Sequence, residues 1–427
     1  MKAIIYTIII VMITINSSIG HNIVVPRIGD TSSRFMSISQ ENKLGSIIYS
    51  QILGSFNLVT DPLITGYVQM LGNRLLVSDY NSSINYRFLV AKNPTINAFA
   101  TPGGVIVINS GLIQKTKTEA ELASVMAHEI AHVKARHLSR MHEESSGVNI
   151  SSALSVIATI VAGMYSTDAL GKTLATTQQV NAQKQITFMR EHEKEADRLA
   201  INIMVNANIN PNAMSEFFKT LQKENNDSGA LEFLRTHPLT KNRIAETQNL
   251  ASRYKGNFSN DSFAYQFTSA RVSIERINTR IFISSYKYNP EITKITPSKI
   301  IDDYGYSLAL IKEKKYKKAT IVLKDLLNIL SDKRELYIIK KYISVALSEA
   351  YLMNNNNEKA ISILEDLHNI YPTDNAVLYY LSNAYIGNKM YKQSIDKLVP
   401  YVIEHKDHRL MLKISEAAYK LKEQSLG

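Results

Sequence analysis

The chain has 427 residues, of which 45% are apolar and 20% charged, values that exclude a disordered chain and a polytopic membrane protein. Its length predicts two domains of ordinary size. The formal net charge of +11 would suit an anionic partner, but no nucleic-acid-binding motif accompanies it, so we expect no nucleic-acid partner. The absence of cysteine excludes disulfides, thiolate metal sites and a cysteine nucleophile, so any metal ion must be bound by His, Asp or Glu.

Residues 1–20 have the pattern of a signal peptide. Lys2 is followed by an apolar stretch from Ala3 to Ile15, which is too short to span a membrane. Small residues at Ser18 and Gly20 provide a cleavage point. An uncleaved anchor is the alternative. The pattern predicts export from the cytoplasm, which the absence of cysteine does not hinder.

A helix that begins after Thr118 carries the first chemical motif. Thr118 and Glu121 have the spacing of a capping box. Because four residues make just over one helical turn, His128 and His132 project from one face and can bind the same zinc ion. Glu129 lies beside them, in a position to take a proton from the water that the metal activates.

Two further histidines follow this motif. A metzincin would need Gly and His at the third and sixth residues after His132, but Ala135 and Leu138 occupy those places, so that class is excluded. His137 and His142 do not have the required offset, and we expect both on the surface.

A second helix, around residues 191–197, supplies candidates for a third metal ligand. Glu193 and Asp197 are four residues apart and share a face, whereas His192 and Glu195 point elsewhere. The second carboxylate can orient a neighbouring group. A charged, solvated helix face without a metal is the alternative.

Between these two helices, residues 153–164 are apolar but too short to span a bilayer. We expect a lid over the active-site cleft. A membrane-surface helix, which would allow peripheral membrane association, and a buried core segment are the alternatives.

The last part of the chain shows a repeat. Tyr351, Tyr385 and Tyr419 are 34 residues apart, which is the tetratricopeptide period, and Ala360 is matched by Ser394 at the same interval. An earlier copy contains Tyr306, Leu310, Ala319, Leu323 and Leu326, and is offset by seven extra residues near 331–334. This predicts three helix pairs and a lone last helix, with an irregular helical bundle as the alternative. Stacked pairs form a concave surface for peptides or proteins.

The expected organisation is a signal peptide at 1–20, a first domain at 21–253, a connector at 254–300 and a repeat domain at 301–427. The connector is predicted to be polar, with one helix near residues 267–282.

The two metal-binding motifs together resemble those of a known family. The His-Glu-x-x-His motif followed by Glu193, Ala196 and Asp197 resembles the gluzincin family of zinc peptidases that includes the CAAX prenyl protease and HtpX. Residues 97–104, leading into 105–108, resemble that family's strand beside the cleft. The signal peptide and the repeats are similar to a soluble, periplasmic branch of the family. The implied fold class is α+β, mostly helical, with a small sheet in a zincin-type domain followed by an all-α tetratricopeptide-repeat domain.

The resemblance also implies the site. One Zn²⁺ per chain would be bound by His128, His132 and Glu193, with Glu129 as general base and Asp197 in support. An extended substrate would pair with the strand formed by Val105, Ile106, Val107 and Ile108.

Two residues further along belong to the same resemblance. His237 would occupy the open zinc position as a latch, because a fourth protein ligand displaces the water that catalysis needs. A turn histidine before Pro238 is the alternative. Arg243 would stabilise the oxyanion of the tetrahedral intermediate.

The function implied is that of a periplasmic zinc endopeptidase that cleaves stalled or misassembled outer-membrane barrel proteins. Its repeats would assist their assembly by contacting the outer-membrane barrel assembly machinery. The alternative is a scaffold or chaperone with a latched, rarely active site. A nucleotide enzyme is disfavoured because the sequence has no P-loop or dinucleotide fingerprint.

Overall fold

The computed structural model describes residues 37–79, 82–144, 179–228, 232–289, 296–330 and 337–426. The expected signal peptide, the apolar segment 153–164, the side chain of His142 and the extra residues near 331–334 lie outside the described residues. Among the helices that are described, none has the length and apolar character needed to cross a membrane.

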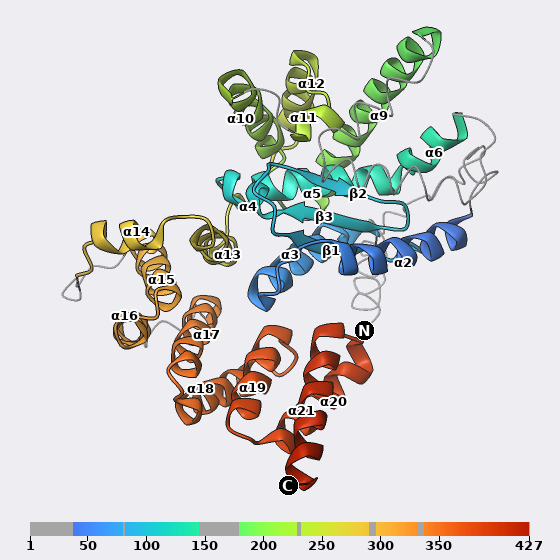
Figure 1. Cartoon of the computed structure of the whole chain (residues 1–427). Helices are drawn as coiled ribbons and strands as arrows, with labels where there is room; N and C mark the ends of the chain where they lie inside the picture. The colour runs from blue at the N-terminus through green and yellow to red at the C-terminus, as the bar shows by residue number, and fades with distance from the viewer. Residues whose placement is uncertain are drawn as a thin grey trace, which may run out of the picture.

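A three-stranded sheet lies at the centre of the first half of the chain (Figure 1). β1 (Arg87–Ala91) runs parallel to β3 (Val105–Asn109), and β2 (Ala98–Ala100) runs antiparallel to β3, which is therefore the middle strand. Successive side chains of a strand point to opposite faces, and every residue of β3 is buried. Both faces of the sheet must therefore be covered by helices.

The helices that cover the two faces of the sheet come from different parts of the chain. On one face, α2 (Ile38–Ser55) packs Leu44 and Ile48 against Val105 and Val107. On the other face, α3 (Pro62–Leu75) and α5 (Glu119–Lys134) share the main core with Ile106 and Ile108. The other helices described in this half are α4 (Ser110–Lys115), α6 (His137–Glu144), α9 (Gln179–Asn206), α10 (Asn212–Ser228), α11 (Glu232–Thr236) and α12 (Lys241–Ser252), with a 3₁₀ turn at Val77–Asp79.

Two local features fix the start of α5 and the turn before β3. The Thr118 hydroxyl accepts the Glu121 N–H at 3.3 Å, as the capping prediction requires, but the Glu121 carboxylate accepts the Lys117 N–H at 2.6 Å. Gly103 and Gly104 have φ of 78° and 86°, a region that side chains rarely adopt. A Cβ on Gly103 would also lie 2.7 Å from the Gly45 Cα, so α2 approaches this turn too closely for a side chain.

The predicted connector differs from the structure. Its described residues up to 289 contain two helices, α13 (Phe263–Ile274) and α14 (Thr279–Ser285), instead of one near residues 267–282, because Asn278 caps a new helix start. It is also not a purely polar link, since Tyr265 and Phe267 are almost fully buried. α13 packs against α3 and α4 in the first half and against α15 and α17 in the second, so it is a core element shared by both halves.

In residues 296–330 and 337–426, the second half consists of three helix pairs and a final helix, as the repeat spacing predicts (Figure 1). The helices are α15 (Pro297–Lys312), α16 (Tyr316–Ile329), α17 (Tyr337–Met353), α18 (Asn357–Ile370), α19 (Asn375–Gly387), α20 (Tyr391–His405) and α21 (His408–Leu426). The small residues Ala319, Ala360 and Ser394 are completely buried, which lets neighbouring helices approach closely. The predicted fold class, a mostly helical α+β chain with an all-α second half, is confirmed.

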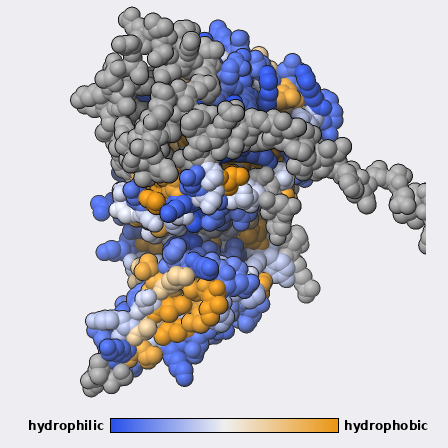
Figure 2. Space-filling model, turned by 90° about the vertical axis from the view of Figure 1, so that its right-hand side faces the viewer, coloured by the Kyte–Doolittle hydropathy of each residue, from blue (hydrophilic) through white to orange (hydrophobic). Residues whose placement is uncertain are grey.

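The repeat array returns to the first half at α19, which packs against α3. Its last two helices expose large apolar side chains, with Ile403 73% and Leu412 71% accessible. Figure 2 shows apolar side chains gathered at this end of the molecule. Exposed apolar surface of this kind is typical of a contact site for another protein.

Candidate active site

Four residues that could bind a metal come together between α5, α9 and the turn after α11. His128 and His132 lie on α5, Glu193 lies on α9, and His237 follows α11. One ligand atom from each lies within 4.8 Å of those of the others. Among the described residues, this is the group of His and carboxylate side chains that could hold a metal ion.

The ring nitrogens of the two α5 histidines face the same point. Their Nε2 atoms are 3.0 Å apart, and Glu193 places Oε2 3.4 Å from the His128 Nε2 and Oε1 3.3 Å from the His132 Nε2. Nearby, the buried Glu129 Oε1 makes no hydrogen bond within the described part of the chain. Two imidazole nitrogens and a carboxylate whose lone pairs converge in a buried space fit a divalent ion such as zinc.

The charge states of Glu193 and His132 suit a bound cation, whereas His128 favours its protonated form. Burial raises the pKa of Glu193, but His237 and the hydrogen bonds from His128 and His132 outweigh it and hold that pKa well below its usual range. Burial lowers the pKa of His132 to about 4, which keeps this imidazole neutral and its lone pair available. For His128 burial acts in the same direction, but hydrogen bonds with Asp197 and Glu193 raise its pKa to about 9.

Glu129 lies beside this group, turned toward β2. Burial raises the pKa of Glu129, and the nearby His237 and His128 partly oppose that effect. A carboxylate with a raised pKa accepts a proton more readily than an exposed one. Glu129 is thus suited to act as a general base next to a metal site.

Asp197 and Arg243 contact the metal-binding cluster on the side away from its centre. The Asp197 Oδ1 is 3.1 Å from the His128 Nδ1, the ring nitrogen that faces away from the centre. Arg243, on α12, binds Asp197 through two bonds of 2.7 Å and reaches Glu193 Oε2 with Nη1 at 2.8 Å. The predicted oxyanion role would require the guanidinium to face an open space. Instead, the buried guanidinium faces carboxylates and the Pro238 carbonyl. The oxyanion role of Arg243 stays a prediction.

His237 occupies the remaining side of the cluster. Its Nδ1 is 3.0 Å from the Glu193 Oε1 and 3.3 Å from the His128 Nε2, while its Nε2 is 3.4 Å from the Glu129 Oε1. Its ring stacks on Phe233, with centroids 4.8 Å apart. His237 therefore lies where a fourth ligand would lie, and its role as a latch stays a prediction.

The expected surface position of His137 is wrong, because this side chain is only 3% exposed in total and contacts the cluster. In a continuous helix, a residue five positions after His132 would point about 140° away from it, which is why the spacing suggests a surface site. Instead α5 ends at Lys134, and Arg136 adopts a left-handed φ of 55°. The chain turns there, and the His137 Nδ1 comes to 2.9 Å from the His132 Nδ1.

The predicted substrate strand is also placed differently. Val105, Ile106, Val107 and Ile108 belong to β3, which pairs with β1 on one side and β2 on the other. Both edges of that strand are occupied, so it cannot pair with a substrate. The edge strand of the sheet next to the site is β2, which packs against α5.

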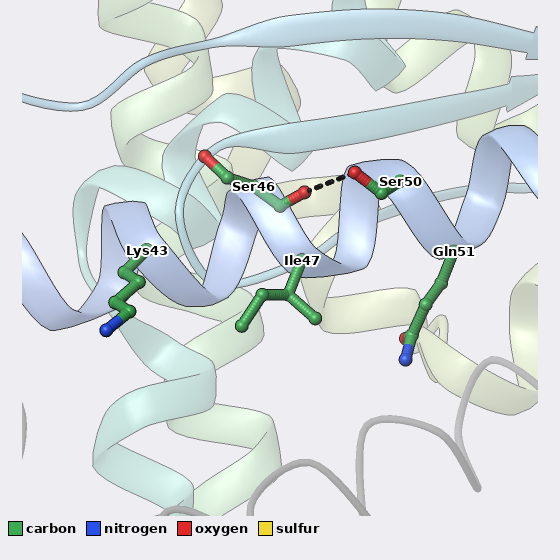
Figure 3. A pocket seen from close by; sticks show the side chains of 5 residues that line it. All are labelled: Lys43, Ser46, Ile47, Ser50 and Gln51. Carbon is green, nitrogen blue, oxygen red and sulfur yellow. Dashed lines mark hydrogen bonds between the residues drawn. The ribbon is translucent and has the colours of Figure 1, made fainter.

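A shallow hollow elsewhere on the surface offers no comparable chemistry. It lies on the outward face of α2 (Figure 3) and is lined by Lys43, Ser46, Ile47, Ser50 and Gln51. The Ser50 hydroxyl donates to the Ser46 carbonyl at 3.1 Å within that helix. No titratable pair or metal-binding group is present among these five residues, so the candidate site remains the cluster described above.

Comparisons with known proteins found bacterial proteases among the similar sequences. The chain is 32% identical to the beta-barrel assembly-enhancing protease of Yersinia pestis over 320 residues, which cover 71% of this chain and 63% of that protein. The chain thus spans less than two thirds of that relative's length. It is 29% identical to the protein of the same name from Escherichia coli K12 over 407 residues, or 94% of this chain and 82% of that one.

More distant matches were also found. The mitochondrial metalloendopeptidase OMA1 of Schizosaccharomyces pombe is 28% identical over 217 residues, which cover 50% of this chain and 61% of that protein. The solved tetratricopeptide domain of P58(IPK) covers 72% of this chain and 80% of its own at 11% identity, with a TM-score of 0.27, too low to support an argument.

The segment that matches a protein family contains all four residues of the cluster. Residues 62–251 match the model of peptidase family M48, a segment that contains both α5 and α9 as well as His237 and Arg243. The expected relationship to this group of metallopeptidases is confirmed. Residues 62–251 of the chain form a metallopeptidase domain of family M48.

Proposed function

We propose that this chain is a zinc-dependent endopeptidase of the periplasm that cleaves stalled or misassembled outer-membrane barrel proteins. Its repeat array would assist the assembly of these clients. The observation that carries the enzymatic part is the buried Glu129 beside the converging lone pairs of the histidine and carboxylate cluster. The names of the bacterial relatives support the part concerning barrel assembly.

The proposed metal ligands are His128, His132 and Glu193, with one zinc ion per chain. A bound zinc ion polarises a peptide carbonyl and lowers the pKa of the attacking water. Glu129 accepts the proton from that water and returns it to the leaving amide nitrogen, as a general base and then a general acid. Asp197 keeps the His128 ring oriented through its Nδ1.

The substrate would bind as an added strand on β2. The backbone of Ala100, at the end of β2, hydrogen-bonds to the Glu129 carboxylate, so this strand passes beside the base. Within the described residues, the sheet order ends at β2, which leaves its outer edge for another strand. Backbone pairing gives affinity with little demand on sequence, which suits an enzyme that acts on unfolded clients.

The repeats would contact the barrel assembly machinery, and the apolar side chains on α20 and α21 are the surface we favour for this contact. Export through the predicted signal peptide and peripheral contact with the membrane complete the proposal. A scaffold or chaperone role is the second candidate, and the observation in its favour is that His237 lies in the fourth position of the cluster, within 3.3 Å of the His128 Nε2.

The deciding experiment replaces Glu129 with Gln in the chain without residues 1–20. The zinc content should remain one ion per chain while cleavage of casein is lost. Glu191→Gln is the matched control, because this glutamate lies on α9 with a side chain that is 66% exposed. If wild-type protein contains no bound zinc after dialysis against a zinc solution, the enzyme proposal fails.

A second variant separates the two candidate functions. If His237 is a latch, His237→Ala should keep zinc and cleave casein faster than wild type. If Glu129→Gln corrects every outer-membrane defect of a strain lacking the gene, the scaffold role is the right one.

A further inference from the structure

We infer that His137 is a positioning residue that fixes the ring of the metal ligand His132 through an imidazole-to-imidazole hydrogen bond. This inference rests on the metal site proposed above. The two Nδ1 atoms are 2.9 Å apart, which is a good hydrogen-bond distance. The ring planes are inclined by 76°, with the edge of one ring directed at the other.

The chemistry of His132 determines which atom donates. Its Nε2 faces Glu193 and His128, so this nitrogen must supply the lone pair to the metal. A neutral imidazole has one N–H, and in His132 it must therefore be on Nδ1. That N–H donates to the His137 Nδ1, which has to be an acceptor.

The next contact satisfies the remaining nitrogen of His137. With Nδ1 as acceptor, its proton lies on Nε2, and this atom is 3.2 Å from the Glu195 Oε2. Glu195 in turn accepts a bond from the Arg140 Nη1 at 3.0 Å. A single assignment of tautomers thus satisfies the chain from Arg140 through Glu195 and His137 to His132.

Packing holds the His137 ring in place for this role. It stacks on His192 with a centroid distance of 4.2 Å and an interplanar angle of 11°. The turn that delivers it is anchored to α2, because Arg136 donates to the Glu41 Oε1 from Nε at 3.0 Å and from Nη2 at 2.8 Å. Three elements, α2, α6 and α9, therefore fix one ring against the metal ligand.

The two histidine ligands are supported differently. His128 faces the carboxylate of Asp197, whereas His132 faces a neutral ring. Outer partners of metal-bound histidines are usually carboxylates, backbone carbonyls or water, and their loss typically weakens metal binding 10–100-fold. An imidazole orients its neighbour without placing a negative charge against it.

The test compares zinc affinity, measured by competition with a chromophoric chelator, for wild type and His137→Phe. Phe keeps the ring that stacks on His192 but cannot accept the Nδ1–H. We expect zinc to bind 10–100-fold more weakly. His137→Gln provides an acceptor oxygen and should recover part of the loss. The visible spectrum of the cobalt-substituted protein should also change in the Phe variant, which a purely structural role would not cause.

The matched control is His405→Phe. This ring also stacks on an aromatic neighbour, Tyr401, with centroids 4.2 Å apart, but it lies on α20 far from the site. It should leave zinc affinity unchanged. If His137→Phe does not fold, Glu195→Ala, which removes the acceptor for the His137 Nε2–H from a side chain that is 45% exposed, should weaken zinc binding severalfold. Unchanged affinity in a folded His137→Phe, or in Glu195→Ala where the first does not fold, would overturn the inference.

These outcomes are distinct from those that test the proposed function. Failure of wild type to bind zinc would refute the metal site itself. Equal, measurable affinity in wild type and variant would refute only the role of His137.

Discussion

The strongest prediction for stability concerns Arg271, a buried arginine on α13 that joins the two halves of the chain. Its Nε donates to the Asp61 carboxylate at 2.6 Å in the first half, and its Nη2 donates to the Glu349 carboxylate at 2.8 Å in the second. The hydroxyls of Tyr304 and Tyr380 lie 3.0 and 3.2 Å from its Nη atoms. The perturbation is Arg271→Met, which keeps most of the apolar stem and removes the charge.

The expected loss follows from these contacts. Breaking a buried ion pair by removing one partner costs about 3–5 kcal/mol, because the remaining charge is left without compensation. The side chains of Asp61 and Glu349 are 21% and 19% exposed, so water reaches both of them. We therefore expect the free energy of unfolding to fall by about 3 kcal/mol, the lower end of that range. Urea titration followed by circular dichroism measures it.

Two further measurements sharpen this test. Hydrogen–deuterium exchange should locate the loss in α13, α17 and α19, the elements that the guanidinium joins. Arg280→Met is the control, since this arginine is 85% exposed in its pair with Glu313 and its removal should leave the urea midpoint unchanged. A loss below about 1 kcal/mol for Arg271→Met would refute the reasoning, because that is the value expected of an exposed pair.

The remaining predictions concern stability at two other places. A Cβ on Gly111 would lie 2.1 Å from the Pro94 carbonyl oxygen, so Gly111→Ala should lower the free energy of unfolding by about 1–3 kcal/mol in a urea titration. Gly54→Ala, in α2 with nothing within 4 Å of the new Cβ, should be neutral or stabilising, and an equal loss in both would contradict the steric argument. Burial raises the pKa of Asp407, but Arg409 and two backbone N–H groups outweigh it, so its pKa is below 3.8. The stabilisation from this charge is present above about pH 4 and disappears as the pH falls through the folded-state pKa. Asp407→Asn should therefore be less stable than wild type at pH 7 in thermal melts, and the difference should shrink as the pH falls below about 4. A difference that does not change with pH would disprove the assignment.

Features that depend on local spacing could be predicted from the sequence. The positions of His128 and His132 follow from one helical turn, and those of Glu193 and Asp197 follow in the same way on α9. The repeat helices could be predicted because the small residues that allow helices to cross recur at a fixed interval. In each case the information lies within one helix or one repeat.

Features that depend on non-local pairing could not be predicted. Nothing in residues 105–108 shows that β1 pairs with one edge of that strand and β2 with the other, since both partners are set by topology. His137 is expected on the surface because it lacks the ligand offset after His132. The left-handed φ of Arg136 turns the chain and buries His137, and a non-glycine residue gives no sequence signal of such a turn. The polar composition of the connector likewise gives no sign that Arg271 is buried against Asp61, Glu349 and Tyr380, which lie far from it in the sequence.

The connector also determines how the repeats relate to the catalytic helix. The first residue of α5, Glu119, accepts bonds from Tyr67 at 3.0 Å and Arg74 at 2.9 Å on α3, and from the Ser262 hydroxyl that caps α13. The Glu119 N–H donates to the Asp261 carboxylate at 3.2 Å. The start of the helix that carries Glu129 and the start of α13 are therefore held by one buried network.

α13 also packs against α15 and α17, so this network connects α5, the helix that carries Glu129, to the first repeat helices. A second link closes the other end of the array, where Arg409, next to the start of α21, donates to the Thr65 hydroxyl on α3. An array attached at both ends cannot swing freely relative to α5. Under the proposed function, a client bound on the repeats would be held at a fixed distance from Glu129, and selection among clients would depend on which of their segments can reach β2.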